Sequence, residues 1–495
     1  MERNKRGAPL DMSPEEFRRA GHALVDRIAD FLRAMPQGAV TAGENPAQVQ
    51  AALGRAGLPQ EGMAAEALLE EATGLLFDHS LFNGHPRFWG YITSSAAPIG
   101  ALGDMLAATV NANVGGWSLS PMASEIERQT VAWLAELIGY PAGCEGLLVS
   151  GGNMANMVGF WAGRRAQAEW DIRGQGVAAG PQLRAYVSQE THTWVQKAAD
   201  LAGLGTAAVR WIETDDQQRL DIVALERAVA ADLAAGDCPF LVVGTAGTVA
   251  TGSVDPLVDL AALCRQQGLW FHIDGVYGAS AAVVPQMGAL LAGLELADSI
   301  ALDPHKWLYA PLEAGCVLVR QKGALVDAFS FQPSYYHLEE GGSEPPVNYF
   351  AYGPQNSRGF RALKVWLALR QVGRAGYEKM IGDDIALAQL LYRNVEEEAE
   401  LEAFSCRLSI AVFRYVPPHL GPAAAGADDY LNELNKELLS RLQAGGQVYL
   451  SNAVVDGRFA LRACIVNFRT QQSDVEALPA MVVQMGGALH EELRG

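Results

Sequence analysis

The sequence predicts an α/β fold built on a mostly parallel sheet, followed by a smaller α+β region. From about residue 85 to 370, short apolar runs that end in Gly, Ser, Thr or Asp alternate with helical stretches. After residue 375 come a long helical stretch and the apolar runs 408–415 and 459–468, separated by a Pro/Gly/Ala-rich connection at 417–427. We therefore expect an N-terminal helical segment (1–84), a large α/β domain (85–372) and a small C-terminal α+β domain (373–495).

The N-terminal segment contains a helix start signal. Ser13-Pro14-Glu15-Glu16 forms a capping box with proline at the first helical position, and apolar residues follow at helical spacing: Phe17, Ala20, Leu24, Ile28 and Phe31. This pattern predicts an amphipathic helix. Its apolar stripe either packs on its own domain or reaches over a partner subunit, and the sequence leaves both open.

The strands expected in the large domain are short apolar runs. They are residues 146–150, 185–188, 240–244, 269–273 and 315–320. Polar residues gather just after several of these runs, where open α/β sheets bind their ligands.

Composition excludes several classes of function. The net charge of −19 disfavours nucleic acid or an anionic membrane as partner, because both require clustered Lys and Arg. The 6 cysteines are scattered, without a C-x-x-C pair or zinc-like spacing, so we expect reduced thiols and no metal site. With no export signal and no apolar run long enough to span a membrane, we expect a cytoplasmic protein.

Lys306 is the first candidate for chemistry. It lies in Ser-Ile-Ala-Leu-Asp-Pro-His-Lys-Trp-Leu (299–308), directly after an apolar strand. A lysine desolvated in such surroundings is a better amine nucleophile at neutral pH. Taken alone, a lysine in a loop is the commoner situation.

Asp274 is the second candidate for chemistry. It ends a fully apolar strand in Phe-His-Ile-Asp-Gly-Val-Tyr-Gly (271–278), followed by residues small enough for a flat ring to approach. A buried carboxylate requires a cation, and a protonated pyridine nitrogen would supply one. A helix cap is the alternative for this residue.

Three further segments follow predicted strands. Ser-Gly-Gly-Asn (150–153) opens a helix, and its free backbone N–H groups suit a phosphate. Thr248, in the small-residue turn 244–252, could hydrogen-bond a cofactor substituent. His192 begins a helical stretch, where it either stacks on a flat cofactor as an acid or base, or caps the helix.

The order of these segments resembles the group II pyridoxal-5′-phosphate (PLP)-dependent amino-acid decarboxylases. The motifs run GG-N, H, GT-x-x-T-G, H-x-D-x-x-Y-G and D-P-H-K-W. The likeness covers nearly the whole chain, including stretches 15–32, 85–91, 119–127, 358–366 and 461–470.

The resemblance implies a fold, an assembly and a set of roles. The fold is the PLP-dependent transferase fold type I, aspartate-aminotransferase-like, with a seven-stranded large-domain sheet, in a homodimer with active sites at the subunit interface. Lys306 would form the Schiff base with PLP, Asp274 would pair with the pyridine nitrogen, and His192 would stack on the ring. The remaining cofactor-binding residues implied are Gly152 and Asn153 at the phosphate, with Thr248, Val276 and His305.

The reaction implied is that of a carboxy-lyase, which converts an L-amino acid to the amine and CO₂. The family takes the proton for Cα from a tyrosine in the stretch that here reads Phe-Gln-Pro-Ser-Tyr-Tyr-His (331–337). Tyr335 matches that position, and the adjacent Tyr336 stays an alternative. A tyrosine there favours decarboxylation over oxidative formation of an aldehyde.

The expected substrate is aromatic: tyrosine, dopa, tryptophan or phenylalanine. The family's side-chain pocket corresponds here to Trp89, Tyr91, Ile92 and Thr93, with Trp117 contributed by the partner subunit. Asn113 and Gly115 depart from the aromatic-acid pattern, and Arg87 could serve an acidic substrate. The alternatives are a decarboxylase of glutamate, aspartate, diaminobutyrate or another non-aromatic amino acid, a fold type I transaminase, and a catalytically silent homologue.

Overall fold

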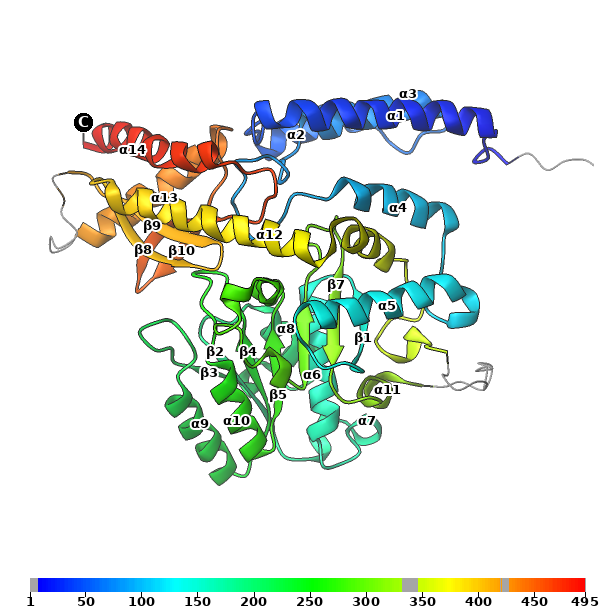
Figure 1. The fold of residues 1–495 in the computed structure, drawn as a ribbon, viewed down its shortest axis with the longest axis vertical. Coiled ribbons are helices and arrows are strands. Elements are labelled where there is room, and N and C mark those ends of the chain that lie inside the picture. The colour runs from blue at the N-terminus through cyan, green and yellow to red at the C-terminus, as the bar shows by residue number, and fades with distance from the viewer. Residues whose placement is uncertain (1–7, 332–345, 419, 421–426, 495) are drawn as a thin grey trace, which may run out of the picture.

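The computed structural model describes residues 8–331, 346–418, 420 and 427–494. Two sheets organise this part of the chain (Figure 1), one of seven strands and one of four. The α/β class with a second α+β region is therefore confirmed.

The large sheet has the order β1-β7-β6-β5-β4-β2-β3. Its strands are β1 (Glu145–Val149), β2 (Leu183–Ser188), β3 (Val209–Ile212), β4 (Cys238–Thr245), β5 (Trp270–Asp274), β6 (Ser299–Leu302) and β7 (Gly315–Val319). Only β7 runs antiparallel to its neighbours, so the sheet is mostly parallel as predicted. The five predicted strands all form, with ends shifted by up to two residues.

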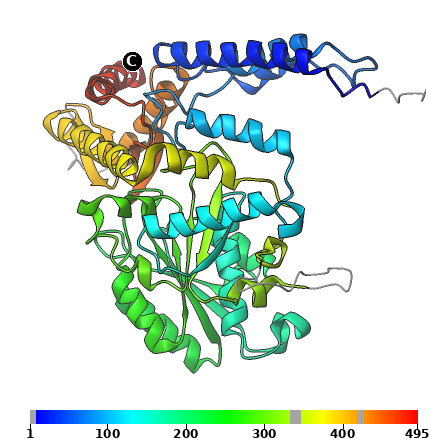
Figure 2. The ribbon, with the colours of Figure 1, turned by 45° about the vertical axis from the view of Figure 1, so that its right-hand side comes forward.

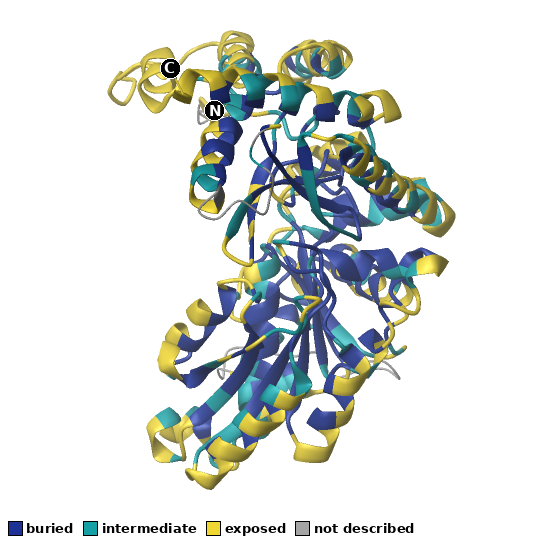
Figure 3. Ribbon diagram, turned by 90° about the vertical axis from the view of Figure 1, so that its left-hand side faces the viewer, coloured by how far each residue is buried: buried dark blue, intermediate teal, exposed yellow. Residues whose placement is uncertain are grey.

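Helices cover both faces of this sheet, which explains why its strands are apolar without alternation. One apolar cluster lies under α5 (Pro121–Leu137), α9 (Ile222–Ala234) and α10 (Leu257–Gln267). The other lies under α6 (Gly152–Gln167), α8 (Trp194–Leu201) and α11 (Ala324–Phe329). Figure 3 shows the buried strands between helices whose outer faces are exposed.

The C-terminal region is an antiparallel sheet covered by helices. Its order is β10-β11-β9-β8, with β8 (Leu401–Arg407), β9 (Ile410–Tyr415), β10 (Ser451–Val455) and β11 (Arg458–Cys464). The long α12 (Ala362–Glu397) packs on α14 (Gln472–Arg494), which also contacts α13 (Ala427–Ala444). The predicted apolar run 459–468 is only partly strand, because β11 ends at Cys464.

The N-terminal residues form α1 (Pro14–Ala34), α2 (Pro46–Leu53) and α3 (Ala65–Asp78), followed by α4 (Pro98–Val110). The predicted capping box is present, with the Ser13 and Glu16 side chains each accepting the other residue's backbone N–H. Phe31 of α1 stacks on Phe77 of α3 at 4.2 Å between ring centroids. These two helices lie side by side, far from the large sheet (Figures 1 and 2). Among the described residues, no helix combines the length and apolarity needed to cross a membrane.

Candidate active site

A cavity of about 600 Å³ opens at the carboxyl ends of the parallel strands. Its walls include Ser150 after β1, His192 after β2, Thr245 at the end of β4, and Asp274 and Val276 at the end of β5. The segment after β6 contributes Asp303, His305 and Lys306. The edge of the sheet where α/β proteins bind ligands thus carries the residues that the sequence singles out.

Lys306 lies in a tight turn directly after β6. Its Nζ is 3.5 Å from Oδ2 of Asp303, and the same oxygen is 3.5 Å from Nε2 of His305. Burial raises the pKa of the Asp303 carboxyl, while the nearby Lys306 and His305 oppose the rise. Lys306 therefore sits in a largely buried site whose nearest acid is Asp303.

Asp274 is buried at the end of β5 and has a strong partner. The indole Nε1 of Trp194 donates to its Oδ2 at 2.7 Å, whereas Oδ1 accepts only from the backbone N–H of Val276 at 3.4 Å. Oδ2 thus has one strong donor, and Oδ1 has capacity to accept from a bound group.

His192 lies at the cavity wall, half-buried, at the start of α8. The backbone N–H of Trp194 donates to its Nδ1 at 3.2 Å, which leaves the proton of the neutral ring on Nε2. Burial lowers the pKa of His192, with Lys306 acting in the same direction and Asp274 against it. The ring is therefore neutral at physiological pH.

The turn 150–153 forms a backbone cradle at the start of α6. Gly151 has φ +128°, a conformation that favours glycine, and a Cβ on Gly152 would come within 2.8 Å of Val276. Gly152 and Asn153 both line the cavity; the backbone N–H of Gly152 hydrogen-bonds to the Asp303 carboxylate, whereas that of Asn153, in the first helical turn, has no partner within the helix. This arrangement suits an anion.

Comparison with known proteins identifies the family of the chain that forms this cavity. The model of the pyridoxal-dependent decarboxylase conserved domain matches residues 46–416. The chain belongs to the pyridoxal-dependent decarboxylase family.

Relatives resemble the chain over nearly its full length. An aromatic-L-amino-acid decarboxylase of Bacillus atrophaeus is 32% identical, over 94% of each chain. Tyrosine decarboxylase 1 of Narcissus pseudonarcissus is 29% identical, over 98% of this chain and 95% of the relative. Among solved structures, Catharanthus roseus tryptophan decarboxylase in complex with L-tryptophan superposes with a TM-score of 0.87 at 26% identity, over 98% of this chain and 100% of the other. This pyridoxal-dependent decarboxylase is thus a fold type I carboxy-lyase whose cofactor is PLP.

The residues that line the cavity match the chemical groups of PLP. Thr245 Oγ1 and Asp303 Oδ1 are buried polar atoms without a hydrogen-bond partner among the described residues, and both residues line the cavity. Unpaired buried polar atoms are costly, and a polar ligand supplies their partners. A basic lysine, an acid with one open oxygen and an anion cradle match an aldehyde, a pyridine nitrogen and a phosphate.

Several predicted site residues lie elsewhere in this decarboxylase chain. Thr248 does not line the cavity, because its hydroxyl is used within its own turn by Thr251 and the N–H of Ser253. Thr245 and Gly247 line the wall, and a role for Thr248 at the cofactor stays a prediction. Tyr335, the predicted proton donor, and Tyr336 lie outside the described residues.

Among the predicted substrate residues, only Ile92 lines the cavity within one chain. Trp89 is completely buried in the C-terminal core and donates to Thr470 Oγ1 at 3.1 Å, so the structure does not bring it to the cavity within one chain. Tyr91 is exposed near Tyr449, and Thr93 is half-buried away from the cavity. Trp117 donates to Glu125 Oε1 at 3.0 Å. Its expected contribution to the site of a partner subunit stays a prediction.

Three important residues went unrecognised in the sequence. Trp194 and Asp303 stand two and three positions from His192 and Lys306, so proximity to a motif was the available signal. Thr245 begins the small-residue turn that was noted for Thr248. In the described residues, no group of three or more His, Cys, Asp or Glu is placed to hold a metal ion.

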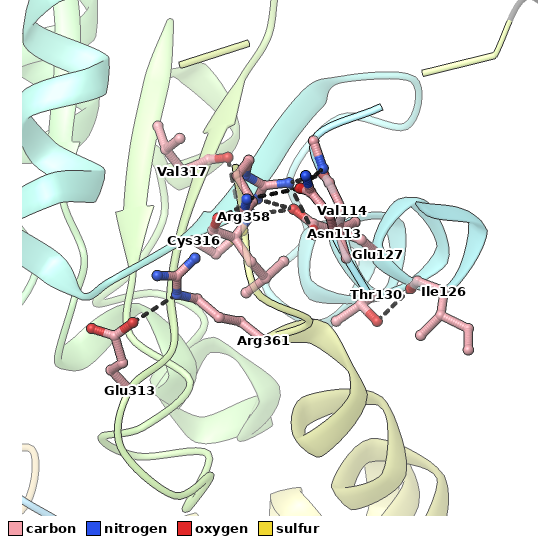
Figure 4. A network of polar contacts seen from close by, with 12 residues as sticks. Asn113, Val114, Ile126, Glu127, Thr130, Glu313, Cys316, Val317, Arg358 and Arg361 are labelled. Atoms are coloured by element: carbon pink, nitrogen blue, oxygen red, sulfur yellow. Dashed lines mark hydrogen bonds and ion pairs between the residues drawn. The ribbon is translucent and has the colours of Figure 1, made fainter. Parts of the chain in front are cut away.

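A buried ion pair fixes the surroundings of the cavity (Figure 4). The guanidinium of Arg358 pairs with Glu127 of α5 and donates to the carbonyl oxygens of Val114 and Leu148. Glu127 in turn accepts from the N–H of Leu148 at 2.9 Å. Segment 113–117 is thereby joined to β1, whose end leads into the glycine cradle.

Proposed function

We propose that this decarboxylase acts on aromatic L-amino acids, releasing CO₂ and the corresponding amine. The observation that carries the reaction is the convergence of Lys306 and Asp274 in one buried cavity beside an anion cradle. The aromatic preference is supported by the apolar side chains of Ile92, Met157 and Leu312 in the cavity wall, and by the similarity to an aromatic-L-amino-acid decarboxylase and a tyrosine decarboxylase.

Each residue has a proposed role. Lys306 would hold the cofactor through its amine, and Asp274 would pair with the pyridine nitrogen and favour its protonated form. His192 would lie against the ring, where its neutral imidazole could hold or pass a proton at Nε2. PLP, when bound, supplies the electron sink that stabilises charge left at Cα as CO₂ departs.

The anion cradle and the polar wall orient the cofactor. Asn153 would present its backbone N–H to the phosphate, Gly152 would leave room for the phosphate to approach the turn, and Val276 and His305 would border the space of the ring. Tyr335, with Tyr336 as the alternative, stays the predicted donor of the proton to Cα.

A homodimer is part of the proposal. Gly100 and Gly103 of α4 face inward, where a Cβ would clash with Pro311 and Leu367. The opposite stripe of α4 is apolar and exposed: Leu102, Met105, Leu106 and Val110. A stripe of this kind on a chain of this family supports burial against a second copy.

The proposal also includes a cytoplasmic location and a division of the chain into three parts at 84/85 and 372/373. A non-helical φ of +68° at Gly373, inside α12, is consistent with the second boundary.

The experiment is product analysis with a panel of L-amino acids: tyrosine, dopa, tryptophan, phenylalanine, histidine, glutamate, aspartate and diaminobutyrate. We expect CO₂ and amine from the aromatic members. Lys306→Ala should reduce turnover by at least about a thousandfold, because the amine nucleophile is lost. Lys436→Ala, on the exposed face of α13, serves as the control.

The other outcomes separate the alternatives. CO₂ released only from acidic or basic amino acids would keep the reaction and reject the aromatic substrate. A keto acid without CO₂ would point to transamination, and normal turnover in Lys306→Ala would reject the catalytic assignment.

A further inference from the structure

A buried carboxylate on α12 contacts the residues that flank Lys306. Asp384 is 2% exposed, and its Oδ2 accepts from Trp307 Nε1 at 2.9 Å and from Tyr309 Oη at 2.7 Å. Asp384 is not part of the cavity wall. Asp384 therefore contacts the turn that contains Lys306, called here the lysine turn, from outside the cavity.

The same helix and its neighbours grip the rest of this turn. Tyr377, also on α12, donates to the carbonyl oxygen of Leu308 at 3.2 Å. Trp307 stacks on Tyr277 at 4.9 Å with an interplanar angle of 15°. The stacked indole points its Nε1 at Asp384.

Tyr309 shows that the turn needs external support. Its φ of +57° lies in the left-handed region, which is costly for a residue other than glycine. The hydrogen bond from its hydroxyl to Asp384 stabilises this conformation. Because the N–H of Tyr309 also donates to the carbonyl oxygen of Lys306, the constraint reaches the catalytic residue directly.

We propose that Asp384 is a positioning residue, whose ionised carboxylate fixes the lysine turn in its reactive orientation and whose protonation releases it. This inference rests on the proposed function, because it assigns a control on the rate of that reaction. Hydrogen bonds to an ionised acceptor are roughly twice as strong as neutral ones, so protonation of Asp384 would weaken its hydrogen bonds to Trp307 and Tyr309.

The surroundings of Asp384 allow this change near neutrality. Burial raises the pKa of Asp384 to about 7, although the Tyr309 and Trp307 hydrogen bonds lower it. The titratable and charged groups facing it are Asp383, Lys379, Arg393 and Tyr377 on α12, Tyr309 on the lysine turn and Cys464 on β11. The exposed pair Lys379–Asp383 is partly neutralised within itself, so burial and three hydrogen-bond donors, Tyr309, Trp307 and the backbone N–H of Asn467, dominate the pKa of Asp384.

The decisive experiment compares Asp384→Asn with wild type across pH 6 to 9, using the PLP-loaded enzyme. Asparagine keeps the shape and an acceptor oxygen but cannot ionise. We expect wild-type kcat to fall as pH drops through about 7. The variant should show a kcat about tenfold lower at pH 8, without that transition and with KM and PLP affinity unchanged, because only the turn's orientation is altered. Asp383→Asn, one residue away and exposed, should keep the wild-type kcat at pH 8 and keep the transition, with its midpoint shifted slightly down because Asp383 raises the pKa of Asp384.

A second readout does not depend on turnover. The visible absorbance of PLP bound at Lys306 should titrate in wild type with the same midpoint and lose that titration in Asp384→Asn. If wild type decarboxylates no amino acid, the proposed function fails while this absorbance still tests Asp384.

A second variant tests the proposal even if Asp384→Asn does not fold. Tyr309→Phe keeps the ring and removes one donor, so its kcat at pH 8 should fall several-fold. Wild-type kcat in Asp384→Asn or in Tyr309→Phe at pH 8 would overturn the proposal. So would persistence of the pH transition in Asp384→Asn, because the titrating group would then be another.

Discussion

Trp194 is the residue on which the acid of the site depends. Its indole N–H donates to Asp274 at 2.7 Å from a fully buried position, and a hydrogen bond to a charged acceptor contributes about 1.5–3 kcal/mol. In Trp194→Phe we expect PLP affinity of the apoprotein and kcat to fall by about tenfold to a hundredfold. Equilibrium titration with PLP measures the first effect. Trp161→Phe, on α6 outside the cavity, is the matched control, and equal PLP affinity in both variants would contradict this role.

His272 couples folding to pH. It is fully buried between Ser299 and Asn156, and burial lowers its pKa to about 4 from the usual 6.5. The folded state thus binds fewer protons than the unfolded state between these values, so stability is lost as pH falls from 6.5 to 4. The loss from this group is about 3 kcal/mol. Urea unfolding at pH 6.5 and 4.5 should show a smaller loss in His272→Gln, whereas His22→Gln, on the exposed face of α1, should match wild type.

At the scale of elements, Arg358 joins a loop, a helix and a strand through one buried guanidinium. Removing one partner of a buried ion pair leaves an uncompensated charge and costs about 3–5 kcal/mol. We expect that loss of unfolding free energy in Arg358→Met, with partial recovery in Arg358→Met/Glu127→Leu. Arg361→Met, whose partner Glu313 is 44% exposed, should cost less than about 1 kcal/mol. Denaturant unfolding checks all three, and equal losses in the two single variants would refute the distinction.

The elements also show where sequence reasoning succeeds and where it stops. The strands before Asp274 and Lys306 were predictable because apolar runs and the polar residues that end them are adjacent in sequence. Trp89 shows the opposite case. Its position in a motif suggested a substrate contact, but its indole packs against residues more than 300 positions away, including Thr470. Local patterns do not encode such packing.

For the whole molecule, the exposed stripe of α4 predicts the oligomeric state. Leu106, which is 52% exposed, is an apolar residue near the middle of this stripe. Leu106→Glu should weaken self-association by at least about 30-fold, because burying an unpaired charge at an interface centre costs about 2 kcal/mol or more. Sedimentation at several concentrations measures this change. Val223→Glu, 62% exposed on α9, should leave the oligomer intact, and a wild-type monomer at micromolar concentration would reject the homodimer.

The sequence by itself determined the fold class, the order of the strands along the chain and the cofactor, and it predicted the lysine and the acid of the site. These features depend on residues close together in sequence, whose hydrophobic periodicity and turn chemistry act locally. Only the tertiary structure decided that Trp194 serves Asp274 across 80 residues and that Asp384 serves the lysine turn across 75 and 77. Such partners are selected by three-dimensional packing in a water-free core, where each buried polar group must find a partner wherever the fold places one.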